Sequence, residues 1–275
     1  MKPGLAEQFR GVRALVTGGS SGIGRATALA LARAGADVAI LARGEERLKD
    51  TLEALQEAAP HQRFFQACCD VADSTQTQPI VDRVLDALGG VDLLVNNAGA
   101  AVAARIGDTP PEAYQALMEI NYHAVVRFTR ALLPDMLARG SGHVVNISSM
   151  AGLVGIYGYT AYAASKFAVS GFSEALRQEL APQGIRVSVV YPPDTDTPQL
   201  AFENRTKPAA TRAVAGNIAP LSADQVAESL LCGVARGRFR IIPGRTAKLL
   251  AFAIRHFPAL ARRVMDRDVA RAGSG

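Results

Sequence analysis

Two side chains that could act together on a carbonyl group, Tyr162 and Lys166, lie four residues apart. On a helix this spacing puts both on one face, one turn apart. An ordinary tyrosine has a pKa of about 10, and a neighbouring ammonium group favours the phenolate and would lower that pKa. Ser149 precedes Tyr162 by thirteen residues, across a glycine-rich loop that can bring the two hydroxyls together. Two hydroxyls on one carbonyl oxygen, one able to give up its proton, form a site for reducing a ketone.

Taken alone, the Tyr-x-x-x-Lys pattern is more typical of a helix surface that carries one aromatic ring and one solvated lysine. The rest of the chain must therefore supply a hydride donor. The 275 residues are 49% hydrophobic and 20% charged, which is typical of a globular chain with a large core. Neither a transmembrane run nor a signal peptide is recognisable, so we expect a cytoplasmic location. The cysteines and histidines lack metal-ligand spacing, so we expect no metal site.

Short apolar runs alternate with helical patterns along the chain. The expected strands are residues 12–17, 36–41, 63–68, 91–95, 143–147, 186–191 and 239–242. The expected helices are residues 26–34, 45–59, 75–88, 112–137, 161–180 and 223–236. Strands that alternate with crossover helices require a parallel sheet covered on both faces. We predict an α/β fold with a single Rossmann-type doubly wound sheet of about seven strands, and ligands at the carboxyl ends of those strands.

A glycine-rich loop, Gly-Gly-Ser-Ser-Gly-Ile-Gly at residues 18–24, follows the first expected strand. Glycine lets backbone approach a pyrophosphate, and a helix that begins near Gly22 directs its unpaired N–H groups at the same point. The loop therefore predicts a dinucleotide site. Its predicted contacts are Gly18, Ser20, Ser21, Gly22, Ile23 and Gly24.

The residues after the second expected strand select between two dinucleotides. A carboxylate at this place would bond the ribose 2′-hydroxyl of NAD. Here Arg43 occupies it, with Arg47 one turn further on. The charge and fork geometry of arginine suit a 2′-phosphate, so we predict NADPH/NADP as the cofactor. Glu45 or Glu46 reaching a ribose is the alternative.

Two further loops follow the third and fourth expected strands. Asp70 and Val71 are expected at the adenine edge, and Asn97, Ala98 and Gly99 along the ribose. Since the carboxyl ends of parallel strands meet at one edge of a sheet, these loops should converge on one ligand.

With these loops in view, the chain resembles the short-chain dehydrogenase/reductase family over nearly its whole length. The matching segments are TGGSSGIG at 17–24, NNAG at 96–99, Asn121, Ser149 and YAASK at 162–166. The resemblance implies that Tyr162 donates a proton to the carbonyl oxygen and that Ser149 orients that oxygen. It implies that Lys166 lowers the pKa of Tyr162 and binds the nicotinamide ribose, while Asn121 holds a water. It also implies a homo-oligomer, a dimer or a tetramer.

A narrower resemblance lies after the sixth expected strand. Residues 191–198 read YPPDTDTP and residues 203–208 read ENRTKP, as in the 3-ketodihydrosphingosine reductases. This likeness implies a long-chain keto sphingoid base as substrate, 3-dehydrosphinganine, reduced with NADPH at its C3 ketone to sphinganine in sphingolipid biosynthesis. Residues 192–220 would form the substrate loop, with Thr195 and Thr197 beside the cofactor.

The substrate loop also admits a physical interpretation. Thr197 followed by Pro198 predicts a helix start, with Thr as the N-cap and Pro at the first helical position. Asp194 or Asp196 could face the ammonium group beside the substrate ketone, and solvated loop carboxylates are the alternative.

Two other functions remain open. The same hydroxyl pair could reduce a 3-oxoacyl thioester or a steroid-like ketone. Alternatively, the chain could be a non-catalytic NADP-binding membrane scaffold, against which stand the intact Ser149, Tyr162 and Lys166.

Positive charge is concentrated at the C-terminal end of the chain. From Arg236 onward ten basic residues and two Asp give a net charge of +8, which leaves −3 for residues 1–235 of a chain of net +5. We divide the chain into an NADP-binding catalytic domain, residues 1–243, and a basic amphipathic tail, residues 244–275. The tail is not interleaved with aromatic residues as base stacking requires, so we expect no nucleic-acid partner.

The tail predicts an amphipathic helix that Pro258 divides. Its expected apolar face consists of Leu250, Ile254, Phe257, Leu260 or Ala261, and Val264. A basic amphipathic helix is typical of peripheral contact with an anionic membrane, here its cytoplasmic face. The alternative is packing on the body of the protein or on a second subunit.

Overall fold

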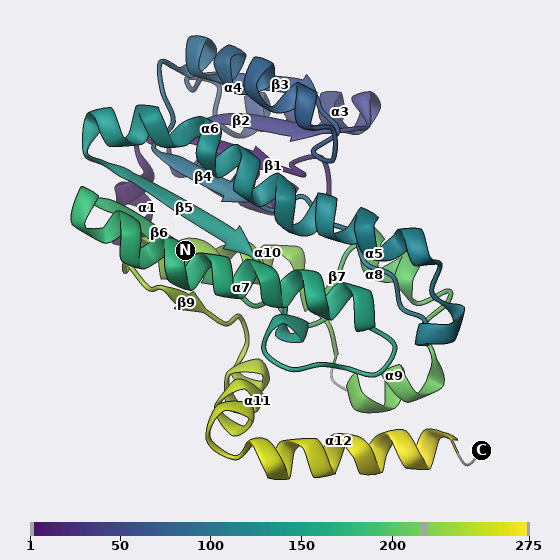
Figure 1. The fold of residues 1–275 in the computed structure, drawn as a ribbon. Helices are drawn as coiled ribbons and strands as arrows, with labels where there is room; N and C mark the ends of the chain where they lie inside the picture. The colour runs from purple at the N-terminus through teal and green to yellow at the C-terminus, as the bar shows by residue number, and fades with distance from the viewer. Residues whose placement is uncertain (1–2, 216–218, 274–275) are drawn as a thin grey trace.

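The computed structural model describes residues 3–215 and 219–273 (Figure 1). Within them lies a seven-stranded parallel sheet in the order β3-β2-β1-β4-β5-β6-β9. Its strands are β1 (Arg13–Thr17), β2 (Asp37–Ala42), β3 (Phe64–Cys68), β4 (Leu93–Asn96), β5 (Gly142–Ile147), β6 (Ile185–Val190) and β9 (Arg240–Ile241). The predicted Rossmann-type α/β fold is thus confirmed. Residues 216–218 of the predicted substrate loop, and residues 1–2 and 274–275, lie outside the described residues.

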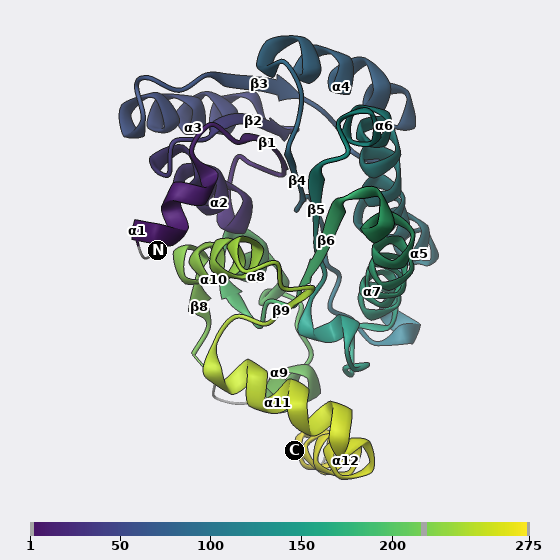
Figure 2. The ribbon, with the colours of Figure 1, turned by 90° about the vertical axis from the view of Figure 1, so that its left-hand side faces the viewer.

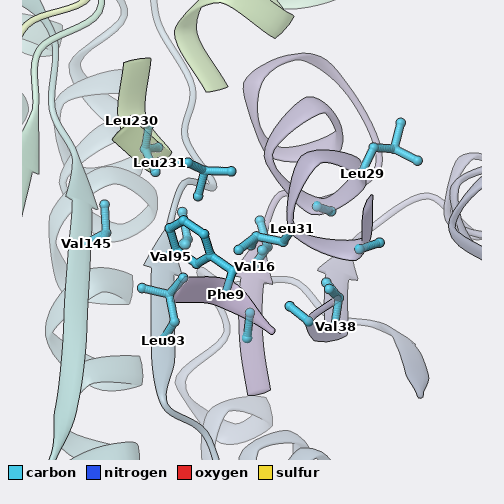
Figure 3. Close-up of a cluster of buried hydrophobic side chains, with 14 of the residues drawn as sticks. Phe9, Val16, Leu29, Leu31, Val38, Leu93, Val95, Val145, Leu230 and Leu231 are labelled. Carbon is cyan, nitrogen blue, oxygen red and sulfur yellow. The ribbon is translucent and has the colours of Figure 1, made fainter. Parts of the chain in front are cut away.

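Helices cover both faces of the sheet (Figure 2). One layer holds α2 (Gly22–Arg33), α3 (Glu45–Ala58) and α10 (Ala223–Ala235); the other holds α4 (Ser74–Leu88), α6 (Ala124–Arg139) and α7 (Thr160–Leu180). Successive strand side chains point to opposite faces. Val16 of β1 therefore packs in the first layer with Leu31 and Leu231 (Figure 3), whereas its neighbour Leu15 packs in the second.

The strand order creates a crevice at the carboxyl end of the sheet. The chain runs outward from β1 through β2 to β3, then returns to β4 on the other side of β1. The strands β1 and β4 are neighbours, and the chain leaves their carboxyl ends in opposite directions, toward β2 and toward β5. Ligands of doubly wound sheets bind at such a reversal.

The predicted helix over residues 112–137 is divided in the structure. It consists of α5 (Pro111–Met118), a π-helical turn (Glu119–His123) and α6. A π turn inside a helix often marks a functional site, and Asn121 lies within this one. The 3.6-residue periodicity of the sequence carried no signal of this insertion.

A small two-stranded element lies beside the crevice. It pairs β7 (Thr195–Asp196) with β8 (Leu221–Ser222). The helix that follows β7 is α8 (Pro198–Glu203), and the Thr197 side chain accepts a hydrogen bond from the Leu200 N–H at 3.3 Å. The predicted N-cap at Thr197 and the first helical position at Pro198 are thus confirmed.

The tail forms two helices, α11 (Arg245–His256) and α12 (Pro258–Gly273), which the predicted break at Pro258 separates. Of the expected apolar face, Ile254 packs with the small Ala247 and Ala251 of α11 against the core. Leu250 instead faces outward. Figures 1 and 2 show α12 alongside α9 (Ala209–Ala215). At the other end of the described residues lies a short helix, α1 (Pro3–Ala6).

Candidate active site

A cavity of 520 Å³ opens at the carboxyl ends of the strands. All the predicted cofactor residues except Gly24 line it: Gly18, Ser20, Ser21, Gly22, Ile23, Arg43, Arg47, Asp70, Val71, Asn97, Ala98, Gly99, Tyr162, Lys166, Thr195 and Thr197. The predicted catalytic Ser149 lines it as well. Loops after six strands, β1 to β6, and the start of α7 thus meet around one space.

The glycines of the first loop keep side chains out of this space. Gly18 and Gly22 have φ angles of +68° and +52°, a region that favours glycine. A Cβ on Gly24 would lie 2.2 Å from the carbonyl oxygen of Gly18, so α2 can begin against the loop only with glycine there. The N-cap residue of α2, Ser21, makes no side-chain capping bond, so the first N–H groups of α2 remain available for an anion.

Asn97 joins the loops after β1 and β4. Its side-chain amide donates to the carbonyl oxygens of Thr17 at 3.0 Å and Gly18 at 3.2 Å. The Thr17 hydroxyl accepts from the N–H groups of Asn97 and Ala98, both at 3.0 Å. The side chain of Asn97 therefore shapes the glycine-rich loop.

Arginine side chains stand at the end of the cavity beyond β2. Arg43 and Arg47 both line it and are exposed. Glu45 forms an ion pair with Lys49 at 3.1 Å. Since neither Glu45 nor Glu46 is among the lining residues, the charge that α3 presents here is positive.

Ser149, Tyr162 and Lys166 meet at the opposite end of the cavity. Both hydroxyl-bearing side chains line the cavity, and the Ser149 hydroxyl acts on that of Tyr162 so as to lower its pKa. Lys166 Nζ lies 5.8 Å from the centroid of the Tyr162 ring, as the shared helix face predicts. Ser148 turns its hydroxyl away and donates to the carbonyl oxygen of Lys166 at 2.9 Å. The geometry therefore brings together the hydroxyl pair that the thirteen-residue spacing indicates.

The pKa of Tyr162 moves in the direction opposite to the prediction. Burial raises it most, the carboxylate of Glu203 raises it further, and the hydrogen bond with Ser149 only partly offsets them. The expected lowering by Lys166 is thus wrong for the protein alone. Tyr162 is held protonated at neutral pH, the form that a proton donor needs.

Lys166 is nearly fully buried, and its Nζ donates to the carbonyl oxygen of Ile147 at 3.0 Å. Burial lowers the pKa of Lys166 to about 8, although the charge of Glu203 acts in the opposite sense. The lysine is therefore mainly charged at neutral pH and becomes neutral just above it.

Asn121 is buried beneath this group. Its amide donates to the carbonyl oxygen of Ala100 and to Ser165 Oγ, both at 2.9 Å, and its Oδ1 accepts from the Ala100 N–H at 2.9 Å. A Cβ on Gly99 would lie 3.0 Å from that Oδ1 and 3.4 Å from Lys166 Nζ. Asn121 thus anchors the wall beside Lys166, and its predicted water stays a prediction.

Sequence reasoning missed Tyr159 and Glu203, which line the same cavity. The Tyr159 hydroxyl donates to Glu203 Oε2 at 2.8 Å, and burial raises the pKa of Tyr159. The rings of Tyr159 and Tyr162 lie 5.3 Å apart. Glu203 belongs to the ENRTKP segment noted above, but a carboxylate on a short loop helix carries no signal of burial.

The two aspartates considered for the substrate ammonium are differently placed. Asp194 lines the cavity but pairs with the buried Lys207 at 3.0 Å. Asp196 is exposed and is not among the lining residues. The hydroxyls of Thr195 and Thr197 donate to the carbonyl oxygens of Pro193 at 2.8 Å and Thr195 at 3.2 Å.

Known proteins share both the sequence and this architecture. The 3-ketodihydrosphingosine reductase of Bos taurus is 36% identical over 244 residues, which cover 88% of this chain and 74% of that protein. A short-chain dehydrogenase/reductase of Burkholderia phymatum, solved with NAD, is 27% identical with a TM-score of 0.81, over 92% of this chain and 95% of its own. A short-chain dehydrogenase of Streptomyces avermitilis is 32% identical with a TM-score of 0.78, and the match covers 96% of this chain and 98% of that one.

The family model of the short chain dehydrogenases matches residues 13–208. These residues run from the first strand of the sheet to the end of the ENRTKP segment, and so contain the glycine-rich loop, the hydroxyl pair and the lysine. By sequence, fold and site, the chain belongs to the short-chain dehydrogenase family of oxidoreductases.

Proposed function

We propose that the protein reduces the C3 ketone of 3-dehydrosphinganine to a hydroxyl with NADPH. The observation that carries the reaction type is the meeting of Ser149, Tyr162 and Lys166 in the cavity that the glycine-rich loop enters. The similarity to 3-ketodihydrosphingosine reductases, which extends over 88% of the chain, supports the substrate.

The cavity fits a dinucleotide. Gly18 to Ile23 and the N-terminus of α2 would hold the pyrophosphate, and Asp70 and Val71 would hold the adenine. Lys166 would bind the nicotinamide ribose. A nicotinamide bound there would supply hydride-transfer chemistry at the carbonyl carbon.

The side chains of the protein, not the cofactor, carry out the proton transfer. The Ser149 hydroxyl orients the carbonyl oxygen, and Tyr162 donates its proton to that oxygen as negative charge develops on it. The charge of Lys166 then stabilises the phenolate that remains. Hydride and proton together convert the ketone into the alcohol.

A substrate panel tests the proposal. Purified protein with NADPH is offered 3-dehydrosphinganine, a 3-oxoacyl thioester and a steroid ketone, and the oxidation of NADPH is followed. We expect the highest kcat/KM for the sphingoid ketone. Preference for either other ketone would overturn the substrate, and no turnover of any would favour the non-catalytic scaffold.

We expect Arg43→Ala together with Arg47→Ala to raise the KM for NADPH by about 10- to 100-fold and to leave the KM for NADH unchanged. Each arginine would contribute a charge-assisted hydrogen bond to the 2′-phosphate, weakened by its exposure. Initial rates with both cofactors measure the effect. Arg33→Ala, an exposed arginine at the far end of α2, is the control. Equal losses with both cofactors would contradict selection by these arginines.

We propose also that residues 244–275 act as a separate membrane-contacting segment on the catalytic domain of residues 1–243. Large apolar side chains are exposed on α11 and α12, among them Leu249 at 70%, Phe252 at 55% and Leu260 at 61%. Basic side chains occur on the same helices, and a groove of 820 Å³ beside α11 is lined by Phe252 together with Arg236, Arg238, Lys248 and Arg255. Apolar area ringed by positive charge matches an anionic bilayer surface. Within the described ranges, every helix is too short or too polar to span a bilayer.

We expect the triple change Leu249→Glu, Phe252→Glu and Leu260→Glu to weaken binding to phosphatidylglycerol-containing vesicles by at least about tenfold, because it removes apolar insertion. Vesicle sedimentation measures it, with Ile106→Glu, at an exposed residue outside the tail, as the control. Undiminished binding of the triple variant, or equal binding to neutral vesicles, would contradict the proposal.

A further inference from the structure

One carboxylate in the cavity has no assigned task. Glu203 ends α8 and is only 8% exposed. Its Oε2 accepts from the Tyr159 hydroxyl at 2.8 Å and its Oε1 from Gln199 Nε2 at 3.1 Å. A carboxylate has about four acceptor sites, so each oxygen can accept a further bond.

Glu203 also lacks a cation in direct contact, although its charge acts on Lys166. Among residues 3–215 and 219–273, no basic side chain lies within 4.0 Å of its carboxylate. Both donors that it does have are neutral. Burying a carboxylate without a partner for its charge destabilises the folded protein. The nearby Lys207 already forms an ion pair with Asp194. The cavity therefore contains one buried negative charge for which a ligand cation would be the natural partner.

Glu203 is close to the reacting group. Its charge acts on both Tyr162 and Lys166, and its partner Tyr159 has its ring 5.3 Å from that of Tyr162. In 3-dehydrosphinganine the carbon next to the ketone carries an ammonium group. With the ketone oxygen bound to Tyr162, the ammonium on the adjacent carbon would lie in the cavity that Glu203 also lines.

We propose that Glu203 binds the substrate ammonium and so selects amino ketones over neutral ketones. This inference rests on the proposed function. Tyr159 and Gln199 act as positioning residues that hold the carboxylate in place. The ammonium replaces the missing cation, and the amine has to be charged for this contact. Neutral ketones of the same chain length would leave Glu203 buried without a cation and would bind less well.

The test compares 3-dehydrosphinganine with its amine-free analogue, 1-hydroxyoctadecan-3-one, in kcat/KM. Glu203→Gln keeps the size but removes the charge, and because one carboxylate oxygen becomes an NH2 group it can keep only one of the two acceptor contacts. We expect it to lower the preference for the amino ketone by about 10- to 100-fold, the worth of one buried charge-assisted bond. Glu179→Gln, the same change at an exposed position on α7, should leave the preference unchanged.

An unchanged preference in Glu203→Gln, whether both rates fall together or neither falls, would overturn the inference and leave the proposed function intact. Failure of the wild type to reduce 3-dehydrosphinganine would instead overturn the proposed function, and the inference with it. Competitive inhibition of the wild type gives an answer that needs no variant. We expect sphinganine to bind at least about tenfold more tightly than octadecane-1,3-diol, and equal affinities would overturn the inference.

Discussion

Tyr162→Phe is expected to lower kcat for ketone reduction by about 10²- to 10⁴-fold, the usual contribution of a positioned general acid. The change removes one oxygen from a ring whose surroundings stay intact, so the affinity for NADPH should change far less than kcat. Stopped-flow or steady-state oxidation of NADPH measures kcat, and fluorescence titration measures cofactor binding.

The control for this change is Tyr157→Phe. Tyr157 is 39% exposed and is not among the residues that line the cavity, so its loss of a hydroxyl should leave kcat unaltered. Full turnover by Tyr162→Phe would remove the phenol from the reaction. A matching loss in Tyr157→Phe would indicate a general effect on the fold instead.

Lys166→Met is expected to lower kcat/KM for NADPH by about 10²-fold or more, since it removes a charge that stabilises the phenolate of Tyr162 and binds the ribose. The wild type should also lose activity with rising pH. Burial lowers the pKa of Lys166 to about 8, so the lysine is charged below that pH and neutral above it. The plot of kcat/KM for NADPH against pH should therefore fall above about pH 8.

The same pH profile in the variant distinguishes a charge effect from a steric one. Lys166→Met has no group to titrate there, so its profile should be low and flat across pH 8. If the variant kept the fall of kcat/KM above pH 8, a group other than Lys166 would be responsible for that fall. Lys49→Met, at an exposed lysine on α3, should keep both the rate and the limb.

The repeating pattern of the sequence determined the architecture. Short apolar runs that alternate with helical periodicity require a covered parallel sheet, and the carboxyl ends of its strands must meet at one edge. The glycine-rich loop after β1 and the four-residue step from Tyr162 to Lys166 are local features. Their geometry follows from backbone conformation and helix pitch, which neighbouring residues largely dictate. The cap at Thr197 is local in the same way.

Tertiary structure decided the electrostatics of the site. The pKa of Tyr162 is raised because burial and Glu203 outweigh the effect that the Lys166 spacing alone suggests. Lys207 forms an ion pair with Asp194, whereas the buried Glu203 has no basic side chain within 4.0 Å among the described residues. These outcomes depend on which segments, distant along the chain, exclude water and bring charges together. A pKa or an ion pair responds to such distances and to burial, and sequence spacing alone contains neither.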